Sequence, residues 1–446
     1  MDLSSFTSSN RLLYIIGGAI ALMIFVVIIF ALRGVTGTTS TLNQDVTLEF
    51  WGVFDDSSAY EATITAFEAA NKHIKVNYTE VSYADYEQTL LNGLAAGTGP
   101  DVLMIDRSWL PKHGDKLLPM PATVPGTNAP LMTLRQFQDT FVDVAQNDLV
   151  NANGRIYALP LYVDTLALYY NKDLLFSAGI PEPPQTWDQF NEAVKKITKR
   201  DDALNIVQSA AAMGTSQNVN RASDILMALM IESGTQMTNA EGTEPTFAIS
   251  VNGQPVGATA LKYYTQFAIP GKEVYTWNAQ QNYSIDAFAT GKTALMINYS
   301  HQGDLLRQSN PRLNFAVAPI PQVNPASVRT FASYWAPAVA KGTRYPYQAW
   351  QFVAYLASPE GVVPYLNAAR RPAARKDLVD QQRNDPDLGV FAEQALTARN
   401  WLQVDNVAIE KIFLDAIDDV TIRREDESTA LQNAQDRVGV LMQRAR

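Results

Sequence analysis

The chain has 446 residues, of which 47% are hydrophobic and 18% charged, so it holds ample apolar material and exceeds what one core usually serves. Its formal net charge of −10 argues against nucleic acid or an anionic membrane surface as a partner, because both need a basic face. The absence of cysteine excludes disulfides, thiolate metal ligands, thiol catalysis and a cysteine-linked lipid anchor.

The first 33 residues contain one uncharged apolar run, 12–32, which is bracketed by Arg11 and Arg33. As a helix this run is about 30 Å long, the thickness of a bilayer's hydrocarbon core. We therefore predict an N-terminal transmembrane helix within 1–33. A cleaved signal peptide is the alternative, although Ile29-Phe30-Ala31 is a poor cleavage motif. In either case the rest of the chain is exported, after a small, polar stretch at 34–45 that predicts a flexible linker.

Strands and helices alternate in the segment that follows the linker. Val46, Leu48 and Phe50 alternate with polar residues, which predicts a strand with one covered face. A capping-box pattern that begins at Ser58 predicts a helix start. The same kinds of pattern predict a strand at 74–78, a helix around Tyr86 and a wholly apolar strand at 102–105. This alternation favours a mostly parallel sheet that helices cover on both faces.

The pattern restarts after Pro160 and ends in helices. The predicted strands lie at 166–170, 294–297, 315–318 and 335–339. The predicted helices begin at Trp187 and Ser223 and span 284–290, 347–357, 406–420 and 428–444. The chain is therefore α/β in class.

Several pieces in a fixed order carry a family resemblance. They are GTGPDVLMID at 97–106, NGRIYALPLYVDTLALYYNKDLLFSAGIPEPPQTWDQF at 153–190, AFATGKTALMINYSH at 287–301, NFAVAPIPQ at 314–322, YQAWQFVAYLASPEG at 347–361 and RRPAARKDL at 370–378. Together they resemble the bacterial family 1 extracellular solute-binding proteins, the carbohydrate-binding class that includes maltose-binding protein. The resemblance extends from Asp45 almost to the C-terminus.

The resemblance implies a two-lobe, periplasmic-binding-protein-like fold of type II. The chain would cross between lobes near Leu161, again at 330–335 and again at 371–378. Lobe one would then contain 46–161 and 336–370, and lobe two would contain 162–335 and 371–446. The division is an expectation from the family, not from the periodicity of the sequence.

Ligands of open α/β sheets bind beyond the carboxyl ends of strands. A sugar presents apolar C–H patches, which stack on aromatic rings, and hydroxyls, which pair with carboxylates and amides. The candidate stacking residues are Trp51, Tyr83, Trp109, Tyr162, Trp277, Tyr299 and Trp335. The candidate hydrogen-bonding residues are Asp55, Asp106, Asp164, Gln236, Asn298, His301 and Arg371.

Each candidate has a structural alternative. Core packing is the usual role of a tryptophan or tyrosine, Asp106 is also placed to cap a helix, and Arg371 is also placed to form a salt bridge between lobes. Asp164 matches the ligand-contacting carboxylate of the resembled family. His301 stands where many relatives carry a stacking tryptophan, and this departure indicates a smaller or more polar ligand than a long oligosaccharide.

No catalytic, metal or cofactor motif is legible. The three histidines are scattered, and no nucleophile elbow occurs. We therefore expect a non-enzymatic binding protein with no cofactor, which captures a mono- or oligosaccharide and delivers it to an ABC permease. Its binding domain would lie on the extracytoplasmic side of a bacterial cell membrane. The alternatives are a membrane-anchored enzyme that acts on glycans and a sensory module that feeds a receptor.

Overall fold

The protein is described here from a computed structural model, which covers residues 44–124, 129–203 and 205–445. Its first sheet has the order β2-β1-β3-β12-β4, in which β1, β2 and β3 are parallel and β12 runs antiparallel to β3. This confirms the parallel sheet expected for the first segment. The strands are β1 (Val46–Gly52), β2 (Ile74–Glu80), β3 (Val102–Asp106), β4 (Leu117–Leu118) and β12 (Trp335–Ala340).

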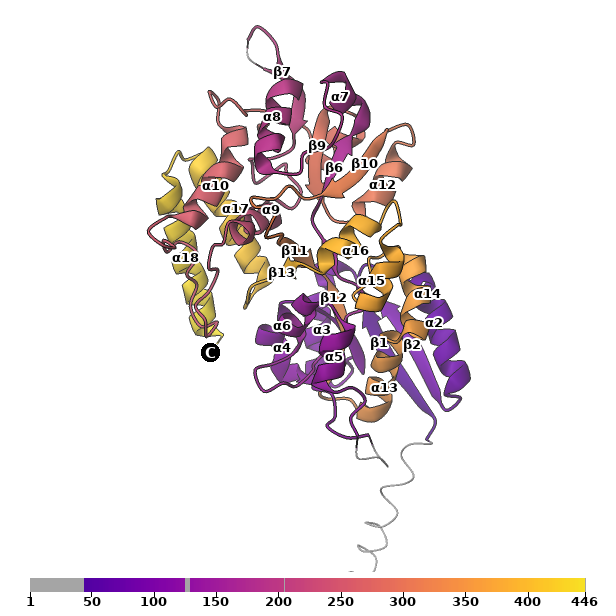
Figure 1. Ribbon diagram of the computed structural model, residues 1–446. Helices are drawn as coiled ribbons and strands as arrows, with labels where there is room; N and C mark the ends of the chain where they lie inside the picture. The colour runs from indigo at the N-terminus through magenta and orange to yellow at the C-terminus, as the bar shows by residue number, and fades with distance from the viewer. Residues whose placement is uncertain (1–43, 125–128, 204, 446) are drawn as a thin grey trace, which may run out of the picture.

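The helices that pack with this sheet come from two distant parts of the chain (Figure 1). They are α2 (Ser57–Ala70), α3 (Tyr83–Ala96), α4 (Trp109–His113), α5 (Leu134–Thr140), α6 (Asp143–Leu149), α13 (Pro346–Leu356), α14 (Pro359–Ala369) and α15 (Lys376–Gln382). The capping box expected at Ser58 is wrong, because Asp56 is the N-cap and its carboxylate accepts from the Ser58 N–H at 2.8 Å.

The second sheet has the order β10-β6-β9-β8-β7, and only the β8–β9 pair within it is parallel. Its central strands are wholly or mostly buried, so helices cover both faces. The strands are β6 (Ala167–Asn171), β7 (Lys199–Arg200), β8 (Ile206–Ala211), β9 (Thr293–Asn298) and β10 (Phe315–Pro319). The expected strands at 166–170, 294–297 and 315–318 are thereby confirmed.

The remaining helices lie mainly around this second sheet and beside it (Figure 1). They are α7 (Lys172–Ser177), α8 (Trp187–Ile197), α9 (Ala222–Glu232), α10 (Val256–Thr265), α11 (Ser284–Ala289), α12 (Gln302–Ser309), α16 (Gly389–Ala395), α17 (Asn406–Thr421) and α18 (Glu427–Arg444). Short 3₁₀ turns occur at Gly114–Lys116 and Gln266–Ala268. Sequence periodicity missed α7, α10, α12 and α16 among these helices.

A small third sheet lies where the two larger units meet, with the order β13-β11-β5 (Figure 1). It contains β5 (Asp164–Thr165), β11 (Thr330–Ser333) and β13 (Ala398–Arg399). β11 is parallel to β13 and antiparallel to β5. Three segments that are remote in sequence are thus hydrogen-bonded side by side at the junction of the lobes.

Two separate hydrophobic cores define the lobes. Val163 lies in the first core and Leu166 in the second, so the chain passes between them at β5. It returns between Phe331 and Ala332, within β11. Ala392, Ala395 and Ala398 still belong to the first core, and Trp401 belongs to the second. Phe391, on the other face of α16, belongs instead to a small third cluster with Tyr169 and Phe288 of the second lobe. The first two changes of core therefore fall at β5 and β11, and α16 contacts both lobes before the chain reaches β13 and the second core.

The predicted transmembrane helix at 12–32 lies outside the described residues. Within 44–124, 129–203 and 205–445, no helix is both long and apolar enough to cross a bilayer.

The contact between α13 and α14 provides a stability prediction. A Cβ atom on Gly361 would lie 2.0 Å from the backbone oxygen of Tyr355, so Gly361→Ala requires a backbone shift. The Gly361 carbonyl also accepts from Thr63 Oγ1 at 2.7 Å, which ties α14 to α2. We expect Gly361→Ala to lower the free energy of unfolding by about 1–3 kcal/mol in urea titrations. Gly342→Ala is the matched control, because no atom lies within 4 Å of its added Cβ, and it should change stability by less than about 0.5 kcal/mol.

Candidate functional site

A cavity of about 430 Å³ lies between the two lobes. Both lobes line this cavity. On the first lobe's side, the β12–β3 pairing places Trp335 opposite Asp106, where β3 ends and β12 begins. Tyr299 and His301 come from the opposite side, directly after β9. The carboxyl ends of β3 and β9 therefore meet at one cavity, as expected for an α/β protein.

The cavity brings together eight of the predicted site residues. They are Tyr83, Asp106, Tyr162, Asp164, Tyr299, His301, Trp335 and Arg371.

An aromatic wall covers the first lobe's side of the cavity. Trp335 is only 6% exposed and contacts Trp109 and Tyr86 edge to face, with ring centroids 5.0 and 5.4 Å away. Phe54 and Tyr83 extend this wall; they are 49% and 51% exposed and stack on each other at 5.1 Å. Their exposed ring faces are suited to apolar C–H groups of a ligand.

Phe54 is a lining residue that sequence reasoning missed. Its φ of 73° is left-handed, an uncommon conformation for a residue other than glycine. It follows β1 directly, so the only signal in the sequence is an aromatic residue just past a strand end. The turn brings the ring to the cavity.

The second lobe presents a polar cluster around Tyr299. The Tyr299 hydroxyl donates to Asp224 Oδ2 at 2.9 Å, and the Arg221 guanidinium lies over the Tyr299 ring at 5.4 Å. The His301 ring is nearly parallel to the Tyr299 ring, with centroids 6.4 Å apart. Asp224 and Arg221 come from α9 and its N-cap, so this helix start supplies charged groups to the cavity.

Asp164 sits in β5, between the lobes, and is 3% exposed. Its carboxylate accepts from the Ser300 hydroxyl at 2.7 Å, from the Ser300 N–H and from the Thr165 N–H. Burial raises the pKa of Asp164 to about 6, although the Ser300 bonds favour the charged form. These contacts fix the carboxylate at the cavity wall.

Two groups hold the Arg371 guanidinium at the cavity, Asp55 and the Tyr162 ring. Its Nη2 donates to Asp55 Oδ1 at 2.8 Å, and its guanidinium lies over the Tyr162 ring at 4.9 Å. The Tyr365 hydroxyl donates to the other oxygen of Asp55. The Nε of Arg371 is buried and makes no hydrogen bond within the described part of the chain. An unpaired buried donor of this kind is uncommon in native proteins.

The charges around the cavity are nearly balanced. Sequence reasoning missed Arg107, Arg221, Asp224, Asp304, Arg370 and Glu410, which line the cavity with the predicted residues. The lining then contains five carboxylates and four guanidinium groups; these are Asp106, Asp164, Asp224, Asp304, Glu410, Arg107, Arg221, Arg370 and Arg371. Such a site suits a ligand that is neutral but rich in hydrogen-bonding groups.

Five predicted residues lie in other environments, and Asp55 acts only through Arg371. The Trp277 side chain is fully buried in the second core and donates to Asn218. Asn298 is fully buried and donates to Asn220. Trp109 packs behind Trp335, Trp51 lies near Gly93 of α3, and Gln236 lines a different hollow.

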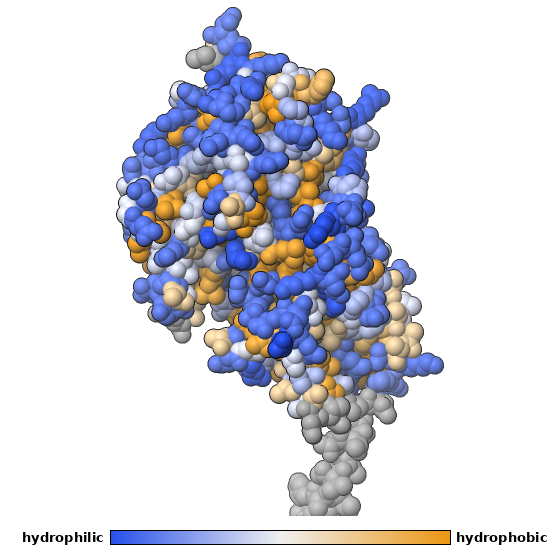
Figure 2. Space-filling model, viewed as in Figure 1, coloured by the Kyte–Doolittle hydropathy of each residue, from blue (hydrophilic) through white to orange (hydrophobic). Residues whose placement is uncertain are grey.

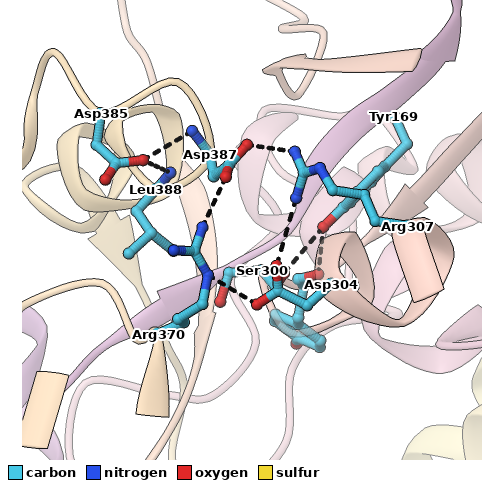
Figure 3. Close-up of polar contacts among 9 residues, drawn as sticks. Tyr169, Ser300, Asp304, Arg307, Arg370, Asp385, Asp387 and Leu388 are labelled. Carbon is cyan, nitrogen blue, oxygen red and sulfur yellow. Dashed lines mark hydrogen bonds and ion pairs between the residues drawn. The ribbon is translucent and has the colours of Figure 1, made fainter. Parts of the chain in front are cut away.

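Polar contacts join the lobes beside the cavity. Figure 3 shows Arg370 between Asp304 and Asp387, with Arg307 bonded to the same two carboxylates. Arg370 caps α14 of the first lobe, whereas Asp304 and Arg307 belong to α12 of the second. Lys112 of α4 also pairs with Asp405 at 3.1 Å. The lobes therefore contact each other through charged groups from separate segments.

The outer surface differs from this lining. Hydrophilic residues cover most of the face shown in Figure 2, and apolar residues are visible at the junction of the lobes. Within the described ranges, no group of three histidine, aspartate or glutamate residues is placed to hold a metal ion.

Two lobes joined by a hinge sheet, with a polar and aromatic cavity between them, define the class of two-lobe solute-binding proteins. A sequence profile described as bacterial extracellular solute-binding protein matches residues 51–363. This match spans most of the chain, and the protein belongs to that family.

Individual relatives agree with this assignment. The chain is 24% identical over 371 residues to a putative binding protein of Brucella abortus, covering 80% of this chain and 84% of the relative. It is 25% identical over 295 residues to the lactose-binding protein of Rhizobium radiobacter, covering 64% of each. The fold matches the sugar-binding protein MalE of Xanthomonas citri with a TM-score of 0.75, at 19% identity, over 90% of this chain and 98% of that one.

The environment of His301 gives a pH prediction. Burial, and then the positive charges of Arg371 and Arg221, lower the pKa of His301 to about 3. The imidazole is therefore neutral at physiological pH, and its NMR signals should stay constant between pH 5 and 8. The chain has three histidines, so the signal lost in His301→Gln assigns the residue. A titration midpoint within this range contradicts the prediction.

The same shift affects stability in acid. The folded pKa lies below the ordinary value, so the unfolded chain takes up a proton that the folded protein excludes. The contribution of His301 to stability is complete above about pH 6.5 and is lost as the pH falls toward 3. The free energy of unfolding should therefore decrease less between pH 7 and pH 4 in His301→Gln than in the unaltered protein.

Proposed function

We propose that this solute-binding protein captures a carbohydrate in the cavity between its lobes and delivers it to an ABC importer. The observation that carries the proposal is that an aromatic wall on one lobe faces balanced charged hydrogen-bonding groups on the other. This combination matches the two surfaces of a sugar, which are its C–H faces and its hydroxyl rim. The cavity volume, about 430 Å³, lies within the ordinary range for small-molecule sites.

The proposed ligand contacts comprise the eight predicted residues that line the cavity and several further lining residues that were not predicted from the sequence. Tyr83, Trp335 and Phe54 supply stacking surfaces, while Asp106, Asp164, Asp224, Arg107 and Arg371 supply hydrogen bonds. Asp55 is a positioning residue, because it orients Arg371 without lining the cavity. We assign structural roles, in packing and in internal hydrogen bonds, to the remaining candidates Trp51, Trp109, Trp277 and Asn298.

Closure of the lobes is the proposed mechanism. We assign 46–163 and 332–398 to the first lobe, and 164–331 and 399–445 to the second, according to the two cores. This assignment puts the third crossing at 398–401 in place of 371–378. A ligand that contacts both lobes stabilises the closed form, because it binds that form better than the open one. The importer would recognise the closed form.

Residues 12–32 are proposed to tether the lobes to the membrane, with a cleaved signal as the alternative. A tether would keep the binding protein near its permease at a high local concentration. We propose no catalytic role and no cofactor. The names of relatives that bind lactose, diacetylchitobiose and galactooligosaccharides support a carbohydrate ligand.

A ligand panel tests this function. Purified full-length protein is incubated with neutral and acidic mono-, di- and oligosaccharides, and with polyols, oligopeptides and polyamines as the contrasting classes. A sugar at 100 times its dissociation constant should raise the free energy of unfolding by about 2.7 kcal/mol and increase the melting temperature. The proposal fails if no saccharide shifts the melting temperature, or if only a different class does.

A matched pair of aromatic variants tests whether the ligand contacts the aromatic wall. Tyr83→Ala removes an exposed ring of the cavity wall and should weaken sugar binding about tenfold in calorimetry, because a stacking surface is lost. Phe176→Ala removes a ring that is 83% exposed on α7, away from the cavity lining, and should leave the affinity unchanged. Equal affinities in the two variants exclude the aromatic wall as a contact surface.

A further inference from the structure

A second, larger cavity of about 1000 Å³ adjoins the first. Arg107 and Gln403 line both cavities, so the cleft continues past them. The first lobe contributes residues around α4 and the end of α6 to the second cavity. The second lobe contributes residues around 231–240, 327–329 and 399–403. The second cavity therefore also lies between the lobes.

The boundary between the cavities contains poorly satisfied donors. Arg107 Nη2 donates to Gln403 Oε1 at 3.3 Å, and the guanidinium lies over the Phe331 ring at 5.0 Å. Arg107 Nη1 is buried and makes no hydrogen bond in the described chain. The side-chain N–H groups of Trp401 and Gln403 both point to the sulfur of Met227, at 3.3 Å. Sulfur is a weak acceptor, so oxygen atoms of a ligand would satisfy these donors better.

The second cavity differs from the first in charge. Three arginines line it, Arg107, Arg329 and Arg399, and Asp148 is the one carboxylate among its lining residues. Asp148 is already engaged, because its Oδ2 accepts from the Tyr334 hydroxyl at 2.8 Å and from Asn400 at 2.7 Å. The second cavity thus has an excess of positive charge, whereas the first has one more carboxylate than guanidinium groups.

The two outer arginines pair with no carboxylate in the described part of the chain. Arg329 donates to the backbone oxygen of Ile231 at 3.2 Å, and Arg399 donates to that of Ala398 at 2.8 Å. Neither forms an ion pair with any described residue. Thr235, from the same wall, carries a buried hydroxyl that makes no hydrogen bond within the described ranges. These groups are suited to an anionic ligand group with several oxygen acceptors.

We propose that the second cavity binds a carboxylate-bearing unit of the ligand, such as a uronate residue, while neutral sugar units occupy the first. This inference rests on the proposed carbohydrate function and narrows its substrate class to acidic oligosaccharides. The ligand would extend past Arg107 and Gln403, with its carboxylate near Arg329 and Arg399. The proposed ligand is therefore longer than the small ligand that we expected from His301 in the sequence alone.

Matched sugar pairs test the inference on the full-length protein. Xylotriose, galactotriose and other neutral oligosaccharides are compared by calorimetry with the same chains carrying one uronate or aldonate carboxylate. We expect at least one acidic member to bind about tenfold or more tightly than its neutral partner, because it gains charge-assisted hydrogen bonds. The difference should shrink as salt is raised from 0.05 to 0.5 M.

Variants that remove single charges test whether the second cavity causes the preference for the acidic sugar. Arg399→Gln alters an exposed side chain and should keep the fold, while Arg329→Gln changes a half-buried one, so melting temperatures without ligand are measured for both. Each should reduce the preference for the acidic sugar severalfold and leave neutral sugar binding unchanged. Arg312→Gln is the control, an exposed arginine that lines neither cavity, and it should keep the preference.

The outcomes separate the two proposals. Binding of neutral sugars with no gain from a carboxylate overturns this inference and leaves the carbohydrate function standing. A gain that survives both Arg329→Gln and Arg399→Gln also overturns it, because the carboxylate then binds elsewhere. Failure of every saccharide, neutral or acidic, overturns the carbohydrate function itself.

Discussion

The hydrogen bonds of the β13-β11-β5 sheet constrain how the lobes can move. The first two changes between the two cores occur within its strands β5 and β11, and β13 adds a third segment to the same ladder of backbone bonds. Asp164 and Ser333 pair within this ladder and also line the cavity. Groups beside a hinge would move little in the proposed rotation of the lobes, whereas Tyr83 and Glu410, on separate lobes, would move farther apart. The cavity therefore combines a nearly fixed floor with walls that can separate.

Most polar groups of the cavity are held by partners from their own lobe. Asp224 accepts from Tyr299, Asp106 accepts from Ser108 at 2.5 Å, and Arg371 is held by Asp55. Such groups stay in place when the lobes open, so a ligand meets an organised half-site on either lobe. Preorganisation of this kind lowers the cost of ordering side chains on binding. The buried charges are thus tolerated because local hydrogen bonds stabilise them.

The direct contacts between lobes include hydrogen bonds, such as that from Asn400 to Asp148 at 2.7 Å, and a group of ion pairs. The pairs in Figure 3 join side chains that are 27% to 44% exposed, and exposed ion pairs contribute little individually. A network of this kind favours closure only modestly. A ligand that bridges both walls can then shift the balance between open and closed forms, because its differential affinity exceeds this small bias.

The sequence by itself determined the two α/β sheets, the family and the site residues that follow strand ends, such as Asp106, Tyr299 and His301. Strand alternation and the direction of parallel strands fix these positions locally. Trp277 and Asn298 were also predicted as ligand contacts, because residue type alone does not distinguish a core or structural role from a contact with a ligand. Their burial depends on neighbours that are remote in the chain.

Only the tertiary structure decided which charged residues of the helices and loops face the cleft. Asp224 lies in the first turn of α9, Asp304 in the first turn of α12 and Glu410 on α17, so they are far apart in sequence but line one cavity. The direction in which a helix presents a charged side chain depends on how its apolar face packs on the cores, a long-range property. The left-handed turn at Phe54 and the second, arginine-rich cavity arise for the same reason, since both depend on how distant segments pack together.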